Sequence, residues 1–398
     1  MRRFAALAAC LLATCAHAAD FPMEFIHGGP VVDNRVHIMI ASDGYTADDL
    51  ASGRFKADAQ AVTDYLLSKP PYSTWRDALV ISRVDVPSQD SGISHPAKQL
   101  IRNTYFGSEY RAFMDHGKPV ESRLTFLADN DVGRTDRVNP GVRRDAVVVL
   151  CNDHDYGGGS GGHVVVMPAC DAKDEVFYHE LGHALHGLAD EYGGDGVADP
   201  VESPSANVSL IGDPTAVKWS DWVRALPDRV RCILGGSGHD QGIYHPTDAC
   251  LMNTLGTAAC PICQERMYRR LMSGVSLIES PAPAPGRITV AQGDSAPFAA
   301  DILGPQSLGD AVGDIAGFSA VWYVDDTELL RKQVPGRMAV VIPTADLTPG
   351  VHTITLMVSD HSPYGCPVAA EDVRHAVRWE LEVTAAGVPA PTAGQSVD

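Results

Sequence analysis

The chain has 398 residues, of which 45% are apolar and 20% charged, a composition typical of two or three folded domains and not of a fibrous, repetitive or largely disordered protein. A formal net charge of −19 argues against nucleic acid and against an anionic membrane surface as partners. After the N-terminal region no apolar run reaches the roughly 18 residues that a membrane helix needs, so no membrane insertion is expected.

Residues 1–18 have the pattern of a secretory signal peptide. Arg2 and Arg3 precede an apolar stretch, and Ala16-His17-Ala18 supplies small residues around a cleavage site. A lipobox-like sequence ends at Cys10, but few apolar residues precede it, so soluble export is favoured over a lipid anchor. We expect an exported protein, periplasmic or extracellular. Its net charge after cleavage changes from −19 to −21, because two arginines and no acidic residues are lost.

Strand and helix patterns alternate in the region that follows. Apolar runs at 36–41 and 78–86 predict strands, and Thr46 between them is a suitable N-cap for a helix that we expect to reach about Leu67. Runs at 145–150 and 163–167 predict two more strands, the first buried on both faces. This order of elements predicts a mixed α/β sheet with a helix packed against it.

A glycine-rich segment, residues 156–162, separates the last two strands. A phosphate-binding loop would continue with Gly-Lys-Ser or Gly-Lys-Thr and enter a helix, and neither follows here. We therefore expect a mobile loop. The strand 163–167 beyond it is expected to form the edge of a cleft, on which an extended substrate could align.

The most informative segment is the predicted helix that carries His179, Glu180 and His183. Histidines four residues apart on a helix lie one turn apart on the same side, so both imidazoles can bind one metal ion. Glu180 can then face the open coordination position and accept a proton from water there. The other side of the helix carries an apolar stripe formed by Phe177, Leu181, Ala184 and Leu188. The sequence therefore predicts a zinc hydrolase site.

A third ligand is expected just after this helix. Gly187 allows the helix to end, which would bring Asp190 or Glu191 back toward the metal. In a continued helix Asp190 would lie roughly 10 Å along the axis from His183, too far to share an ion.

The second half of the chain changes character. Residues 218–223 predict a short amphipathic segment, and Met252 follows in a turn, where a methionine can form an apolar floor beneath a metal. Proline-rich residues 279–286 are typical of a linker, and spaced apolar runs beyond them predict an all-β sandwich. The expected organisation is a signal peptide (1–18), a catalytic domain (19–278), a linker (279–286), an Ig-like β-sandwich (287–384) and a disordered tail (385–398).

Seven cysteines remain after the signal peptide. In an exported protein we expect most of them to form disulfides. Cys260 and Cys263 form a Cys-x-x-Cys pair, but no second such pair is present, which argues against a four-cysteine zinc site. The pair is therefore interpreted as two structural cysteines that bridge elsewhere.

Together these residues resemble the IgA-peptidase family of secreted bacterial zinc metallopeptidases. The resemblance covers residues 36–275 and rests on His179 to Tyr192, Asp43 to Thr46, Asn152-Asp153 with Tyr156 to Gly158, and Cys250 to Met252 followed by the Cys-x-x-Cys pair. It implies a metzincin-like catalytic domain with one zinc ion and endopeptidase activity. It also implies that His179 and His183 are ligands, Glu180 the general base and Met252 the Met-turn residue. Immunoglobulin cleavage is not implied, because the family takes its name from one substrate.

One spacing departs from the wider metzincin pattern, in which the glycine and the third ligand follow the second histidine by three and six residues. Here Gly187 follows His183 by four and Asp190 by seven, so the step from glycine to ligand is still three. Asp190 is therefore favoured as third ligand, with Glu191 as its rival. His186 would lie on the helix above the metal, in a supporting or exposed position.

The resulting hypothesis is a secreted zinc-dependent endopeptidase in which metal-activated water, with Glu180 as general base, hydrolyses peptide bonds of a protein or peptide. Tyr192 or Tyr244 could stabilise the oxyanion. The alternative is an adhesin, or a module that binds glycan or host protein, with a non-catalytic metal site. A third possibility is hydrolysis of a peptidoglycan cross-link amide. The intact Glu180 argues against a role in binding alone.

Overall fold

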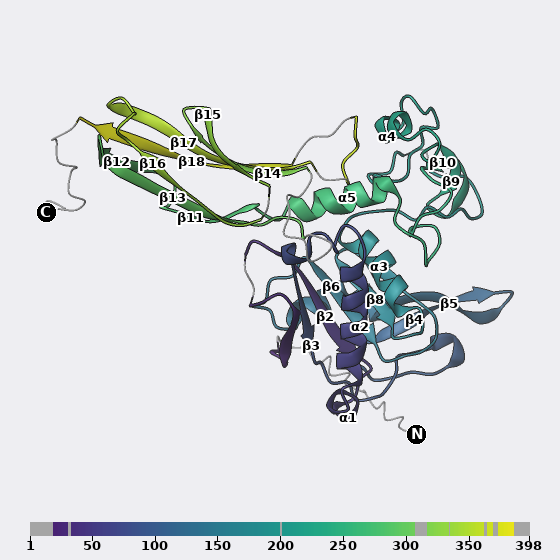
Figure 1. Ribbon diagram of the computed structural model, residues 1–398. Helices are drawn as coiled ribbons and strands as arrows, with labels where there is room; N and C mark the ends of the chain where they lie inside the picture. The colour runs from purple at the N-terminus through teal and green to yellow at the C-terminus, as the bar shows by residue number, and fades with distance from the viewer. Residues whose placement is uncertain are drawn as a thin grey trace, which may run out of the picture.

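The computed structural model describes residues 19–30, 33–199, 201–306, 317–333, 335–361, 364–368 and 373–385. The predicted signal peptide, and all but the first residue of the predicted tail, lie outside these residues. Within them the N-terminal half contains a six-stranded sheet with helices, and the C-terminal part contains two further sheets (Figure 1).

The first sheet is mixed, as the sequence predicts. Its strands are β1 (Met23–His27), β2 (Val36–Asp43), β3 (Leu79–Val84), β6 (Ala146–Cys151), β7 (Gly159–Gly161) and β8 (Val164–Pro168), in the order β1-β3-β2-β6-β8-β7. The four central strands are parallel, and β1 and β7 run antiparallel at the two edges.

Both faces of this sheet are buried, which explains the unbroken apolar runs in its central strands. Alternate side chains such as Ile40 and Val148 pack against α2 (Arg54–Ser68) and α3 (Lys173–Ala184), while Ala41 and Val149 belong to a second cluster on the opposite face. Each fully buried valine or isoleucine contributes about 1.5–3 kcal/mol to folding. The sheet thereby holds α3 in a fixed position.

The predicted helix 46–67 is interrupted. Thr46 caps α1 (Ala47–Ala51) through a reciprocal pair of hydrogen bonds with Asp49, but α1 ends after one turn and α2 begins at Arg54. Between them Gly53 has a φ of +82°, a left-handed conformation that a right-handed helix cannot contain. The prediction of one continuous helix is therefore wrong at this glycine.

The glycine-rich segment is also more ordered than expected, because part of it forms β7. This strand pairs with β8, which is therefore bonded on both sides by β6 and β7. The prediction that the strand 163–167 forms the cleft edge is corrected: β7 lies outside it. Beside β7, the hairpin of β4 (Ser108–Asp115) and β5 (Lys118–Leu127) extends away from the sheet (Figure 1).

Shorter elements complete this half. Single turns of 3-10 helix occur at Arg76–Ala78, Pro96–Lys98 and Ala128–Asn130, and a longer one at Val132–Arg137. The predicted segment around the tryptophans forms α4 (Ser220–Ala225), and the hairpin of β9 (Ile233–Gly236) and β10 (His239–His245) follows. The helix α5 (Pro261–Met272) was not predicted, because the Cys-x-x-Cys pair at its start was interpreted as bridging cysteines. No helix in the described ranges has the length and apolar character needed to cross a membrane.

The C-terminal part is a sandwich of two sheets. One contains β11 (Ile278–Ala282), β13 (Ser295–Ile302) and β16 (Gly336–Pro343). The other contains β12 (Arg287–Ala291), β14 (Phe318–Val324), β15 (Thr327–Lys332), β17 (Gly350–Asp360) and β18 (Val373–Thr384). Phe298 from the three-stranded sheet packs on Trp322 and Trp379 of the five-stranded sheet, with ring centroids 6.2 and 5.3 Å away.

The predicted linker 279–286 is partly a strand. Residues 278–282 form β11, which pairs with β13 in spite of the prolines, because edge strands tolerate proline. The sandwich and the first sheet also share one continuous hydrophobic cluster, which passes through α5. In this cluster Tyr268 of α5 lies between Trp75 and Tyr364, with ring centroids 6.1 and 5.8 Å away.

Candidate active site

The helix α3 presents two histidines to solvent and its apolar residues to the sheet. Phe177 and Leu181 are completely buried, whereas the rings of His179 and His183 are partly exposed on the other side. Asp174 and Glu175 occupy the first turn, where acidic side chains interact favourably with the helix dipole. The 3.6-residue period thus fixes both imidazoles on one ridge of a rigidly packed helix.

The chain turns back directly after α3. The helix ends at Ala184, Gly187 has a φ of +64°, and the Leu188 amide donates to the Gly182 carbonyl at 3.0 Å. This reversal is the one that the glycine predicts, and it brings Asp190 beside the two histidines.

Three potential ligand atoms converge at this point. His179 Nε2 and His183 Nε2 lie 3.2 Å apart, and each lies 3.2 Å from Asp190 Oδ1. A tetrahedral zinc ion with ligand bonds of about 2.0–2.1 Å holds neighbouring ligand atoms about 3.3 Å apart. Asp190 Oδ1 is buried and makes no well-aligned hydrogen bond with either imidazole, although it is close to both. The geometry and the donor types therefore fit a zinc ion, with room for a further ligand.

Hydrogen bonds on the far side of each imidazole set its tautomer. His179 Nδ1 donates to the Leu251 carbonyl at 3.0 Å, and His183 Nδ1 donates to the Leu188 carbonyl at 2.7 Å. Because a carbonyl oxygen can only accept, the proton is on Nδ1 in both rings. Each Nε2 lone pair is thereby directed toward the site, as metal binding requires.

The charges of these groups depend strongly on one another. Burial disfavours a charged imidazole at His183, but the adjacent Asp190 carboxylate outweighs it and raises the pKa of His183 to about 9. Burial raises the pKa of the Asp190 carboxyl group, but the close contacts and positive charge of His179 and His183 outweigh burial, so the pKa is lowered. The raised pKa favours a second proton on His183, at Nε2, and a metal ion would have to displace that proton to bind there.

Glu180 is held close to the histidines by the glycine-rich segment. Its side chain is only 9% exposed. A Cβ atom on Gly158 would lie 2.6 Å from Val176 Cγ1 and 3.1 Å from Glu180 Oε1. The absence of a side chain at Gly158 thus lets the segment before β7 close over α3 and confine the Glu180 carboxylate. Close packing, and not anion binding, accounts for this glycine.

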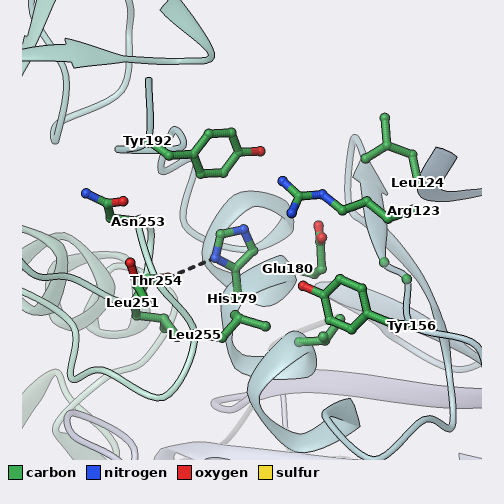
Figure 2. A pocket seen from close by; sticks show the side chains of 13 residues that line it. Arg123, Leu124, Tyr156, His179, Glu180, Tyr192, Leu251, Asn253, Thr254 and Leu255 are labelled. Carbon is green, nitrogen blue, oxygen red and sulfur yellow. Dashed lines mark hydrogen bonds between the residues drawn. The ribbon is translucent and has the colours of Figure 1, made fainter. Parts of the chain in front are cut away.

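Two cavities meet at the histidines. The first, of about 290 Å³, is bounded by α3, by β5 and by the chain after Met252, and it contains Arg123, Tyr156 and Tyr192. The second lies along β7 and contains His183 and Asp190. His179, Glu180 and Tyr192 line both cavities, so the two form one cleft that passes over the three converging atoms. Figure 2 shows the side chains of Arg123, Tyr192 and Tyr156 around His179 and Glu180.

Met252 lies beneath the helix that carries the histidines. It is completely buried, and a Cβ on Gly182 would come within 2.8 Å of its Sδ atom. Gly182, between the two histidines, therefore allows the methionine to approach the helix closely. The structure thus places Met252 under α3, on the buried side of the site.

Other predicted residues lie elsewhere. Glu191 is buried and faces Asn207 and Cys263, so Asp190, and not its rival, approaches the histidines. Tyr244 lies on β10 with its ring over Gly212 and lines neither cavity of the cleft. His186 is buried and accepts a hydrogen bond from the Tyr72 hydroxyl. Burial, with a further contribution from two arginines, lowers the pKa of His186 to about 3, so it is neutral.

Arg123 was not predicted to belong to the site. Its guanidinium carbon lies 5.6 Å from the centre of the Tyr192 ring, and its side chain enters the first cavity. Arg123 lies far from the histidines in sequence, on a strand of mixed composition. No local pattern could have identified it, because only the position of the hairpin brings it there.

Two other motifs within the predicted resemblance have structural roles. The Asp43 carboxylate accepts hydrogen bonds from the backbone amides of Phe106 and Ser108, at 3.1 and 3.0 Å. The Asn152 side chain donates to the Gly44 carbonyl at 3.0 Å. The Asp43 contacts fasten the start of β4 to the end of β2 and so support the hairpin that forms one wall of the cleft, whereas the Asn152 contact joins the ends of β2 and β6.

The expected disulfides are not formed. All seven cysteines among the described residues are free. Cys250, Cys260 and Cys263 gather instead around Glu191. The sequence could not reveal this cluster, because its four members come from three separate segments.

Comparison with known proteins identifies the family of the chain. A search of curated proteins found no match. The family model of the IgA peptidase M64 family matches residues 24–227, a range that contains the sheet, α3, Asp190 and Tyr192 but ends before Met252 and the three clustered cysteines. Since this match spans more than half of the chain, the protein belongs to the IgA peptidase M64 family, a family of metallopeptidases.

Proposed function

We propose that the protein is an exported zinc-dependent endopeptidase that hydrolyses peptide bonds in the cleft over α3. The observation that carries the proposal is the set of three ligand atoms of His179, His183 and Asp190, each 3.2 Å from the other two, beside the confined carboxylate of Glu180. Membership of a peptidase family supports a protein or peptide as substrate.

His179, His183 and Asp190 would hold the metal. When bound, the ion would polarise the scissile carbonyl and make a water molecule more acidic. The carbonyl groups of Leu251 and Leu188 keep the imidazoles in the tautomer that this requires. The proposed arrangement, with a glycine turn before the third ligand and Met252 beneath the helix, is metzincin-like.

Glu180 is the proposed general base. Its carboxylate lines both parts of the cleft, so it can reach a water molecule that approaches the scissile carbonyl from the side of the histidines. It would accept the proton from that water as the C–O bond forms, and then deliver the proton to the leaving amine nitrogen. The close fit of Gly158 limits the positions that the carboxylate can occupy.

Tyr192 and Arg123 are the proposed partners of the oxyanion. Burial and the nearby Asp190 raise the pKa of Tyr192 to about 12, so its hydroxyl stays protonated and can donate a hydrogen bond. Arg123 supplies a permanent positive charge on the same side of the cleft (Figure 2). Donors fixed before the reaction begins stabilise the charge that develops in the transition state.

The shape of the cleft favours cleavage within a chain. It continues on both sides of the histidines, along β7 in one direction and toward Leu251 in the other. An extended peptide can therefore occupy positions before and after the scissile bond. An enzyme that removes terminal residues would instead need a wall at one end.

The first test is hydrolysis of unfolded casein by residues 19–398. The Glu180→Gln variant removes the base and keeps the volume, and general base catalysis typically contributes about 10²–10⁴-fold. We expect a loss of kcat in that range with zinc content unchanged. Equal hydrolysis by both proteins would refute the mechanism. Inactivity of both, with zinc bound, would favour the alternative of a binding protein.

Export is a further part of the proposal. It rests on the basic and apolar character of residues 1–18, which precede the described residues. We propose cleavage after Ala18 and a catalytic part that extends through α5. A substrate panel that contains peptidoglycan cross-link peptides beside casein would show whether cell-wall amides are cleaved instead.

A further inference from the structure

A second group of metal-ligating side chains lies behind the catalytic cleft. Glu191, Cys250, Cys260 and Cys263 are all buried, at 3% exposure or less, and their ligand atoms lie within 4.8 Å of one another. None of them belongs to the set formed by His179, His183 and Asp190. The cysteines also lie beyond residue 227, where the family match ends.

The distances fit a tetrahedral ion better than a disulfide. Cys250 Sγ and Cys263 Sγ are 3.7 Å apart, and Glu191 Oε1 lies 3.1 Å from Cys263 Sγ and 3.7 Å from Cys260 Sγ. Zinc–sulfur bonds of about 2.3 Å place tetrahedral sulfur ligands about 3.8 Å apart. A disulfide would need about 2.05 Å. Since three thiols crowd together here, a single disulfide would also leave one of them unpaired beside Glu191.

The surrounding backbone is arranged to stabilise negatively charged sulfur. The amides of Met252 and Cys260 both point at Cys250 Sγ, at 3.5 and 3.3 Å. Cys260 is the N-cap of α5, and Cys263 lies in its first turn, so both sulfurs are close to the positive end of the helix dipole. The two amide donors favour the thiolate form of Cys250, which is the form that binds zinc.

Glu191 provides an independent reason for a cation. Its Oε2 atom is buried without a hydrogen-bond partner, and Oε1 receives a hydrogen bond from the buried Asn207 amide at 3.0 Å. Within the described ranges no lysine or arginine pairs with this carboxylate. A buried carboxylate beside three thiols and no positive charge is costly in free energy, and a divalent ion would remove that cost.

We propose that Glu191, Cys250, Cys260 and Cys263 form a second, structural zinc site. Three thiolates and one carboxylate complete a tetrahedral set, so no position is left for water or substrate. Cys260 also lines a cavity that contains Asp248 and Gln264, which offers the ion a path from solvent. The ion would join the segment after α3, the turn before Met252 and the start of α5.

This site would support the catalytic one without taking part in the chemistry. Glu191 follows Asp190 directly, and its amide donates to the Met252 carbonyl at 2.7 Å. Fixing the Glu191 side chain on one side of the backbone therefore fixes Asp190 on the other. The second ion would therefore hold in place both Asp190, the third proposed catalytic ligand, and Met252, which lies beneath α3.

Metal content of residues 19–398 tests this site separately from the proposed function. Because each complete ligand set holds one ion, we expect about two zinc ions per chain in the wild type, about one in His183→Ala and about one in Cys263→Ser. Cys170→Ser, outside the cluster, is the matched control and should retain both ions. A wild type with one ion that His183→Ala removes would overturn the second site. One ion that only Cys263→Ser removes would instead refute the catalytic metal.

Cobalt substitution and thiol alkylation provide readouts that do not depend on activity. Cobalt-loaded His183→Ala should keep a thiolate-to-cobalt charge-transfer absorption, because its cysteine cluster is intact. In the native zinc protein Cys250, Cys260 and Cys263 should resist iodoacetamide until a chelator is added, and then react. Absence of the absorption, or detection of a Cys250–Cys263 disulfide by mass spectrometry, would contradict the proposal.

Discussion

The two tyrosines predicted as possible oxyanion partners, Tyr192 and Tyr244, differ in what they can do. The hydroxyl of Tyr192 lies in the cleft beside Arg123, whereas Tyr244 packs over Gly212 outside it. Removing an oxyanion donor typically costs about 10²–10³-fold in kcat. We expect that loss in Tyr192→Phe with KM little changed, and activity within about twofold of wild type in Tyr244→Phe, the matched control. Casein hydrolysis under saturating substrate measures both, and equal losses would remove Tyr192 from the mechanism.

His186 gives the fold a pH dependence that is separate from catalysis. Its pKa is lowered to about 3 by burial, against about 6.5 in the unfolded chain, so only the unfolded state gains a proton as the pH falls below 6.5. Stability is therefore complete above pH 6.5 and declines below it, by about 2 kcal/mol from this residue at pH 5.

Urea unfolding at pH 7.5 and pH 5 checks this contribution. His186→Gln cannot take up the proton, so its stability should fall less between the two pH values than that of the wild type, by about 2 kcal/mol. The other histidines are present in both proteins, so their contributions to the pH dependence of stability cancel in the comparison. An equal decline in the two proteins would show that His186 is protonated in the folded state.

At the scale of elements, the segment before β7 positions the carboxylate of Glu180, the proposed general base. A methyl group at Gly158 would overlap Val176 on α3 and crowd Glu180, whereas Gly161 has no neighbour near an added Cβ. We expect Gly158→Ala to lower kcat/KM by about 10–100-fold, since displacements of about 1 Å at a reacting group cost this much. Gly161→Ala should stay within about twofold of wild type. Similar activity of both variants would mean that this segment does not hold Glu180.

Much of this half could be predicted, because the signals are local. Unbroken apolar runs indicated β2, β6 and β8. The spacing of His179, His183 and Gly187 indicated both the side of α3 that carries the two histidines and the end of this helix. The family resemblance is confirmed by the match over residues 24–227. The features that could not be predicted depend on contacts between distant segments. Arg123 enters the cleft only because the hairpin lies there, and Glu191 meets the cysteines only after the chain turns at Gly187.

Errors at element boundaries have equally specific causes. Gly53 lies in a helical pattern but adopts a left-handed conformation, and β7 has only three residues, too few to show an alternating pattern. The Cys-x-x-Cys pair favoured an interpretation as bridging cysteines, although Cys263, Met267 and Leu271, spaced four residues apart, already follow the helical period of α5. That period is the signal that could have identified α5.

At the scale of the whole molecule, one hydrophobic cluster joins the two halves of the described chain, where the sequence predicts two domains and a linker. Tyr268 of α5 packs between Trp75 of the first half and Tyr364 of the second, and Arg35 pairs with Glu279 at the start of the sandwich. Removing the sandwich would therefore expose apolar surface on α5. We expect residues 19–278 alone to melt at least about 5 °C below residues 19–398, a difference of a few kcal/mol.

Calorimetry of the two chains measures this dependence. Glu279→Gln in the full chain is the milder comparison, because it breaks the pairing with Arg35 and leaves the apolar contacts in place. Its melting temperature should change by no more than about 2–4 °C. An unchanged melting temperature of residues 19–278 would show that the two parts are thermodynamically independent.

The helix α5 also has a mechanical consequence. The helix α5 lies between the two halves (Figure 1), and its buried side chains belong to one hydrophobic cluster that joins them within the described residues. A macromolecule bound to the sandwich would meet the cleft at a nearly constant distance and orientation. Such a molecule would be cut only where its own shape places an extended segment at that distance, so the selectivity of the enzyme would depend on the dimensions of a target as well as on the residues around the scissile bond.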